Sequence, residues 1–210
     1  MALNVQAQKQ LHSELTREDM QMLISKFDTT NVGQYVRDYE EKNKFTFPDQ
    51  YKEFLLKYNG GYTPVTEFRI AKTSSDLEGF FGVGNADEIL NYSLFDSMNR
   101  ISDFLEDNML PIGTNAFGDY IAIAVRAENT GKVYFLYHDR PTKYIELTED
   151  FRTFVSKCRS RKIGHIRTIE ERTAMFIANF PDDEITQETI CDWQAEIDEY
   201  GNMNQEELVF

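Results

Sequence analysis

His138 and Asp139 are adjacent residues that could act as a general-base dyad, because a carboxylate can orient an imidazole that takes up a proton. Neighbouring residues of a strand, however, point to opposite faces of the sheet. We therefore interpret this as a strand-end pair and expect no catalytic residues in the chain. An enzyme would need a pocket with perturbed titratable groups around His138, Asp139 or Asp119.

Histidine and cysteine spacing does not indicate a metal site. The histidines, His12, His138 and His165, show no HxxxH or HxH spacing, and no cysteine is near enough in sequence to complete a zinc set. Cys158 falls on the apolar stripe of an expected helix, which favours a buried thiol. The Gly-x-Gly at 82–84 lacks the remainder of a phosphate-binding loop. We expect neither a metal nor a cofactor.

Asn115, Asp119 and Tyr120 belong to a polar loop, made flexible by Gly118, that enters an expected strand. Such a loop could form the rim of a cleft, and these three residues are candidate contacts for a partner. The alternative is a simple strand connection in which Asn115 and Asp119 bond the local backbone.

Acidic residues are concentrated near the C-terminus. The 210-residue chain has a net charge of −14, and residues 170–210 hold twelve acids against one base, Arg172, a net charge of −11. Such a polyanion is repelled by nucleic acid and by anionic lipid, so we expect neither as a partner. The candidate partner-binding acids are Asp182, Asp183, Glu184, Glu188, Asp192 and Glu196. Alternatively, they form a solvated helix face that keeps the protein soluble.

Hydrophobic spacing predicts helices, then strands, then helices, which is an α+β order. The predicted helices cover residues 16–27, 32–39, 48–58, 86–95, 148–158, 166–180 and 190–200. The predicted strands cover residues 65–70, 80–83, 110–113, 120–125, 133–137 and 144–147. Trp193 lies on an apolar stripe and is either core or an anchor. The apolar residues 208–210 are expected to dock on the domain or on a partner.

The chain carries signals of a reducing compartment. Its two cysteines form no CxxC motif or paired framework. The first ten residues lack the basic and apolar regions of a signal peptide, and no 18-residue apolar run could span a bilayer. We expect a cytoplasmic protein.

Residues 47–61 read FPDQYKEFLLKYNGG, and further motif segments lie at 110–122 and at 131–135 with His138 and Asp139. The first resembles the signature helix of the SUKH superfamily, and the others are similar to its later pair of segments. This superfamily joins fungal cell-wall-synthesis regulators to many bacterial immunity proteins. The resemblance covers about residues 30–158, with order and spacing intact, and leaves the acidic tail outside.

The resemblance implies a twisted, mainly antiparallel sheet with flanking helices, to which the tail adds an acidic helical C-terminal extension. We therefore expect an N-terminal helical extension over 1–29, a SUKH-like core over 30–163 and the acidic extension over 164–210. The family's motif residues are largely architectural. By this resemblance, Pro48 starts a helix, Gly60 and Gly61 cap it, and Gly113 and Gly118 shape a loop.

The resemblance also implies a non-enzymatic binding protein. Many bacterial members bind and neutralise a cognate toxin, often a nuclease or deaminase domain delivered by a neighbouring cell. Such toxins must attract nucleic acid, so their active surfaces are basic, and an acidic inhibitor would be steered to them. We therefore favour an immunity protein with a basic toxin as its partner. The alternative is a regulatory interaction module without a toxin, like the fungal relatives. The oligomeric state stays open.

Overall fold

The computed structural model describes residues 21–92, 100–201 and 203–210, and over these it contains six helices and a nine-stranded sheet. The helices are α2 (Val32–Asn43), α3 (Asp49–Tyr58), α5 (Arg100–Glu106), α6 (Phe151–Lys157), α7 (Ile169–Asn179) and α8 (Gln187–Tyr200). The strands are β1 (Leu23–Lys26), β2 (Gly61–Ile70), β3 (Thr73–Phe80), β4 (Met109–Thr114), β5 (Tyr120–Ala124), β6 (Val133–Tyr137), β7 (Arg140–Thr148), β8 (Cys158–Ser160) and β9 (Glu206–Glu207). The predicted α+β class is confirmed.

The strands form one antiparallel sheet in the order β7-β6-β5-β4-β3-β2-β1-β9, and β8 pairs with β2 beside this path. Strands β2 to β7 follow the chain as a meander in which each strand pairs with the next. The two ends of the described chain meet at the other edge, because β9 pairs with β1. Residues 206–207 thus share the sheet with residues 23–24.

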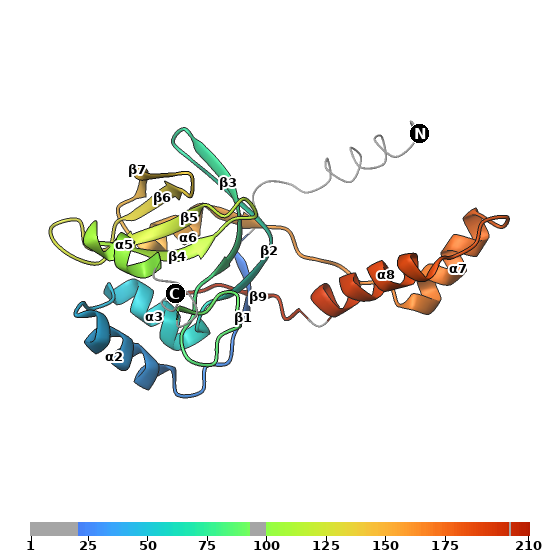
Figure 1. Cartoon of the computed structure of the whole chain (residues 1–210), viewed down its shortest axis with the longest axis horizontal. Helices are drawn as coiled ribbons and strands as arrows, with labels where there is room; N and C mark the ends of the chain where they lie inside the picture. The colour runs from blue at the N-terminus through green and yellow to red at the C-terminus, as the bar shows by residue number, and fades with distance from the viewer. Residues whose placement is uncertain (1–20, 93–99, 202) are drawn as a thin grey trace.

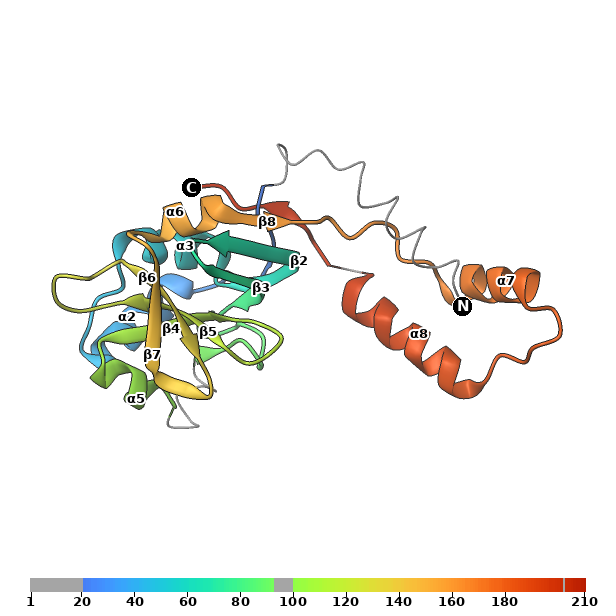
Figure 2. The same ribbon diagram turned by 90° about the horizontal axis from the view of Figure 1, so that it is seen from above.

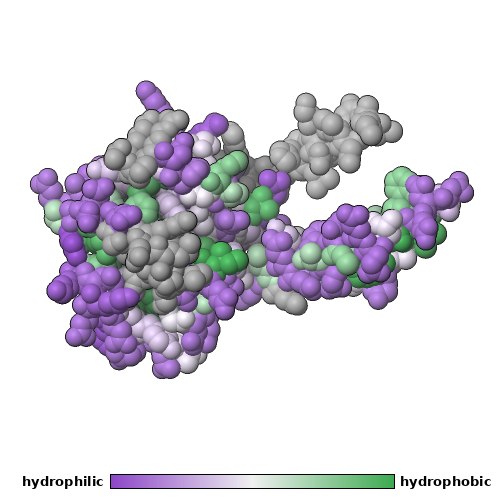
Figure 3. All heavy atoms as spheres, in the orientation of Figure 1, coloured by the Kyte–Doolittle hydropathy of each residue, from purple (hydrophilic) through white to green (hydrophobic). Residues whose placement is uncertain are grey.

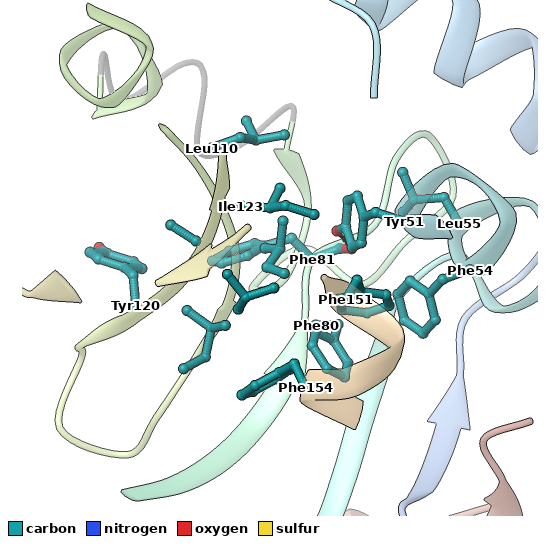
Figure 4. Packing of buried hydrophobic residues seen from close by; sticks show 14 of the residues in the cluster. Tyr51, Phe54, Leu55, Phe80, Phe81, Leu110, Tyr120, Ile123, Phe151 and Phe154 are labelled. Atoms are coloured by element: carbon teal, nitrogen blue, oxygen red, sulfur yellow. Dashed lines mark hydrogen bonds between the residues drawn. The ribbon is translucent and has the colours of Figure 1, made fainter. Parts of the chain in front are cut away.

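The core is rich in aromatic side chains that join α3 and α6 to the sheet (Figure 4). Phe151 of α6 lies 5.1 Å from Tyr51 and 5.2 Å from Phe54 of α3, measured between ring centroids. Phe80 of β3 lies 5.1 Å from Phe54 and completes the group. All four side chains are buried, and edge-to-face ring packing adds to the hydrophobic stabilisation.

Helix α3 follows the signature motif closely. It begins after Pro48 and ends at Asn59, whose φ of 55° lies in the left-handed region. Gly60 follows with a φ of 79°. The left-handed cap position is therefore taken by the asparagine, and the glycine after it continues the turn.

The helix predicted over residues 16–27 is wrong where the structure describes it, because Leu23–Lys26 is strand β1. Thr16, Asp19 and Met20 lie outside the described residues. The apolar spacing of Leu23, Ile24 and Phe27 fits either structure in so short a segment. Pairing with β2 and β9 on both sides decides for the strand.

The helix predicted over 86–95 is also wrong for residues 86–91, and residues 93–95 lie outside the description. Asn91 Nδ2 donates to the carbonyls of Gly84 and Ala86, and Asp87 accepts from the Ile89 amide. These side-chain bonds to the backbone compete with helix formation. They hold a compact loop instead.

The structure moves one end of a predicted strand and the start of a predicted helix. The strand predicted over 80–83 ends at Phe80, and Gly82 makes only a single bridge with Asn91. Helix α6 is capped by Asp150, which accepts from the Thr153 amide at 2.8 Å, rather than by Thr148.

Both helices predicted in the acidic tail are confirmed as α7 and α8. They form a hairpin that projects from the sheet in both views (Figures 1 and 2). No residue of either helix is buried. Beyond α8, Leu208 is buried and the ring of Phe210 lies 5.7 Å from that of Phe151, so the expected docking of residues 208–210 on the domain is confirmed.

Candidate functional site

The loop between β4 and β5 is held from within by Asn115, which is 3% exposed. Asn115 Oδ1 accepts from the amides of Phe117 and Asp119, at 3.0 and 2.8 Å. Its Nδ2 donates to Ser75 Oγ of β3 at 2.9 Å and to Asp119 Oδ2 at 3.3 Å. The side chain is therefore committed to shaping the loop and tying it to β3.

Asp119 pairs with His138 across strands β5 and β6, a contact that the sequence did not predict. Asp119 Oδ1 accepts from the His138 backbone amide at 3.0 Å and lies 2.8 Å from His138 Nδ1. Partial burial would raise the pKa of Asp119, but hydrogen bonds from His138 and Asn115 outweigh it and lower this pKa. The structure thus joins His138 to Asp119 rather than to its neighbour Asp139.

Tyr120 begins β5 and is buried, with its ring 5.4 Å from that of Phe104. It therefore packs in the core and offers little surface to a partner. The loop tip is different, because Ala116 and Phe117 are exposed, Phe117 to 76%. Gly118 at the same tip has a φ of 80°, and a Cβ added there would meet nothing within 4 Å.

The six candidate acids of the tail all lie on the projecting hairpin. Asp182, Asp183 and Glu184 are exposed in the connection between α7 and α8. Glu188 and Asp192 are exposed on α8. These five lie apart from Asn115 and Asp119.

The two helices of the hairpin meet along a half-buried seam. Arg172 Nη1 of α7 lies 2.7 Å from Glu196 Oε2 of α8, and this pairing lowers the pKa of Glu196. The rings of Phe176 and Trp193 lie 6.3 Å apart in the same seam. Trp193 is thus partly covered by α7, neither fully core nor fully exposed.

A cleft of about 520 Å³ lies where the hairpin meets the sheet. One wall is the outward face of the β2–β3 hairpin, and the other is the end of α8 with the segment that leads into α7. Ala116 of the Asn115 loop and Glu196 of the tail both line it. The structure therefore brings one end of each candidate region to the same cleft.

The cleft is strongly acidic. Its lining includes five carboxylates against one base, Arg161; the five are Glu67, Asp76, Glu78, Glu196 and Glu199. Tyr62 and Tyr200 line the same cleft.

The charges of this cleft act on both tyrosines. A hydrogen bond with Glu199 and burial, with added repulsion from Glu78 and Glu196, raise the pKa of Tyr200 to about 12. Burial, Asp87 and then Glu78 and Glu199 raise the pKa of Tyr62. The negative potential of the cleft therefore spans both of its walls.

Sequence reasoning missed Glu67, Glu78 and Glu199 as cleft residues. The alternation of Val65 and Glu67 could have placed an acid on the outward face of β2. Nothing local in the sequence indicates that the end of α8 lies opposite this face.

Over the described residues, no three His, Cys, Asp or Glu side chains gather where they could hold a metal ion. None of the described helices is both long enough and apolar enough to cross a membrane.

Two proteins of Bacillus subtilis (strain 168) are similar to this chain. Uncharacterized protein YnaB is 34% identical over 106 residues, which are 50% of this chain and 58% of YnaB. SPbeta prophage-derived uncharacterized protein YokK is 25% identical over 152 residues, 62% of this chain and 76% of YokK. The match thus spans less than two thirds of the length of YnaB.

A family model described as the SMI1 / KNR4 family (SUKH-1) matches residues 34–157. These residues hold most of α2, all of α3 and the meander from β2 to β7, together with both motifs that carried the resemblance. The match covers more than half of the sequence and confirms the resemblance, so the chain belongs to the SMI1/KNR4 family (SUKH-1).

Proposed function

We propose that this chain is a non-enzymatic immunity protein that neutralises a basic toxin domain, of nuclease or deaminase type, by binding it directly in the cytoplasm. Membership of a family known for protein–protein interactions supports a binding role. The toxin as partner is our inference from the charge and shape of the α7–α8 hairpin.

The hairpin is the observation that carries this proposal. It projects from the sheet, and three of its large apolar side chains stay exposed: Met175 at 46%, Ile177 at 56% and Phe180 at 53%. Figure 3 shows hydrophobic atoms among hydrophilic ones near its outer end. Apolar side chains grouped within a polar surface are typical of a protein interface.

The negative charge of the hairpin also supports the proposal. Residues 170–210 carry a net charge of −11, and the acids around the turn, Asp182, Asp183 and Glu184, are exposed. A surface that binds nucleic acid must be positive, so attraction to this hairpin would speed the encounter and orient it. The acids would then steer the toxin while the apolar side chains bind it.

Survival under toxin expression tests the proposal. The full chain is co-expressed with basic nuclease and deaminase toxin domains of the source genome, and binding to each purified domain is measured at about 50 and 500 mM salt. We expect protection against one domain, with an affinity that falls as salt rises. Protection against none, with binding only to endogenous housekeeping proteins, would instead favour the regulatory module.

Removing three negative charges from the hairpin turn sharpens this test. Asp182→Asn, Asp183→Asn and Glu184→Gln together should slow association about tenfold at low salt, because rim charges act mainly on the association rate. The matched control removes three exposed acids elsewhere, by Glu41→Gln, Glu106→Gln and Asp107→Asn. Equal slowing in both variants would contradict a role for the hairpin in particular.

A further inference from the structure

Glu67 of β2 and Asp76 of β3 stand directly opposite each other on the outward face of their hairpin. Like charges at directly opposed positions destabilise a strand pair. Asp76 is partly compensated, because its Oδ2 accepts from the Ala116 amide at 3.0 Å. On its other side, Glu67 lies directly opposite Arg159 of β8, which offsets this repulsion. Within the described chain, Glu67 and Glu78 form no ion pair, so both carboxylates remain available to a bound cation.

Tyrosines on both walls add groups that recognise a cationic side chain. Tyr200 and Glu199 approach from α8, and Tyr62 lies in β2 on the facing wall. A guanidinium group can stack on a tyrosine ring and donate to carboxylates at the same time. The apolar lining from Val65, Ile163 and Met203 suits the methylene stem of such a side chain.

We propose that this cleft between the β2–β3 hairpin and the end of α8 binds an arginine side chain presented by the partner protein. The inference rests on the proposed function and deepens it, because it names the group that the partner inserts. The occupant follows from charge complementarity, since the lining holds five carboxylates and one base, and Arg172 pairs with only one of the five, Glu196. The hairpin acids would steer the partner, and the cleft would fix its register.

The test uses a labelled peptide, acetyl-(Gly-Arg)₃-amide, and its counterpart with citrulline in place of arginine. Citrulline keeps the shape of the side chain and removes its charge. Binding to the full chain is followed by fluorescence anisotropy at about 50 mM salt. We expect at least tenfold tighter binding of the arginine peptide. Equal binding of both peptides would overturn the proposal.

Paired substitutions locate the binding. Glu78→Gln with Glu199→Gln removes two charges from the cleft, and the control, Glu41→Gln with Glu106→Gln, removes two exposed charges elsewhere in the domain. The cleft pair should weaken binding of the arginine peptide about tenfold, and the control pair less than twofold. Equal weakening by both pairs would show diffuse attraction and overturn the cleft as the site.

Glu67→Gln gives a readout that damage to the fold would not produce. It removes a charge that lies between Asp76 on one side and Arg159 on the other, so the melting temperature should change little while affinity for the arginine peptide falls. A fall in both would mean that Glu67 serves only the fold, against the proposal.

The toxin experiment separates this inference from the proposed function. If the arginine peptide binds in the cleft but no toxin domain is neutralised, the proposed function is wrong and the cation site stands. If the cleft pair loses the peptide yet binds and neutralises a toxin with unchanged affinity, the proposed function stands and the arginine inference is overturned.

Discussion

The side chain of Asn59 and the backbone of Val83 form a closed pair of hydrogen bonds. The Val83 amide donates to Asn59 Oδ1, and Asn59 Nδ2 donates to the Val83 carbonyl, both at 2.9 Å. Nδ2 also donates to the Asp28 carbonyl at 2.8 Å. Asn59 is completely buried, so the residue that ends α3 also ties together the segments after β1 and after β3.

Replacing this side chain should therefore be costly. Asn59→Ala would leave the buried amide and carbonyl of Val83 without these partners, and each unsatisfied buried group costs about 1–3 kcal/mol. We expect a loss of roughly 3 kcal/mol or more in the free energy of unfolding, measured by urea denaturation. Asn129→Ala, at an exposed turn, should cost less than about 0.5 kcal/mol. Similar losses in the two variants would contradict the role of Asn59.

Gly60 and Gly118 allow a matched comparison because their φ angles are 79° and 80°. A Cβ at Gly60 would lie 2.6 Å from the carbonyl oxygens of both Phe80 and Phe81, whereas a Cβ at Gly118 meets nothing within 4 Å. Gly118→Ala should cost only the left-handed backbone strain, about 1 kcal/mol. Gly60→Ala adds a backbone clash and should cost more than about 3 kcal/mol in thermal unfolding. Equal losses of stability in the two variants would mean that close packing around Gly60 does not contribute to the stability of the fold.

The parts of the fold that sequence predicts are those with a clear local period. Helices α3 and α8 and the β5–β6 pair repeat their apolar residues over ten or more positions, so periodicity identifies them. Strands β1 and β9 have four and two residues and pair with each other across the chain, which no local pattern reveals.

Only part of the candidate site could likewise be predicted from the sequence. The acids of the hairpin follow from composition, because all six lie within the short segment 182–196. The cleft joins Glu67 and Glu78 to Glu199, and this approach depends on how the chain returns to the sheet after α8. Likewise, the pairing of His138 with Asp119 depends on the register of β5 and β6, which sequence alone does not set.

The Asp119–His138 pair predicts a dependence of stability on pH. The pKa of Asp119 is lowered from 3.8 in the folded chain, so the unfolded chain binds this proton more tightly. The stabilisation that the Asp119 carboxylate provides is therefore present above the pKa of this group in the unfolded chain. It is lost as pH falls through the lower pKa of the folded chain. Asp119→Asn should lower the free energy of unfolding by about 1–2 kcal/mol at pH 7, since hydrogen bonds to a charged group are lost.

Urea unfolding of this variant and of the parent chain at pH 7, 5 and 3 checks the sign. The difference in the free energy of unfolding between the variant and the parent chain should shrink toward pH 3. The control, Asp107→Asn at an exposed site, should show a small difference that changes little with pH. A gap between Asp119→Asn and the parent that widens on acidification would contradict the proposed role of the carboxylate.

The α7–α8 hairpin should unfold before the sheet. Local stability follows buried apolar contacts, and no residue of either helix is buried. Trp193, the single tryptophan of the chain, lies on α8 and reports on this seam. We expect the urea midpoint from Trp193 fluorescence to lie roughly 1 M or more below the midpoint from circular dichroism of the sheet.

Two substitutions show which transition belongs to which part. Arg172→Ala removes the partner of Glu196 in the seam and should lower only the fluorescence midpoint. Phe154→Leu changes a fully buried side chain of α6 and should lower mainly the midpoint seen by circular dichroism. If the two transitions coincide and each substitution moves both, the hairpin is stabilised by the sheet. It would then meet a partner as a rigid arm of the domain rather than as a surface that orders on binding.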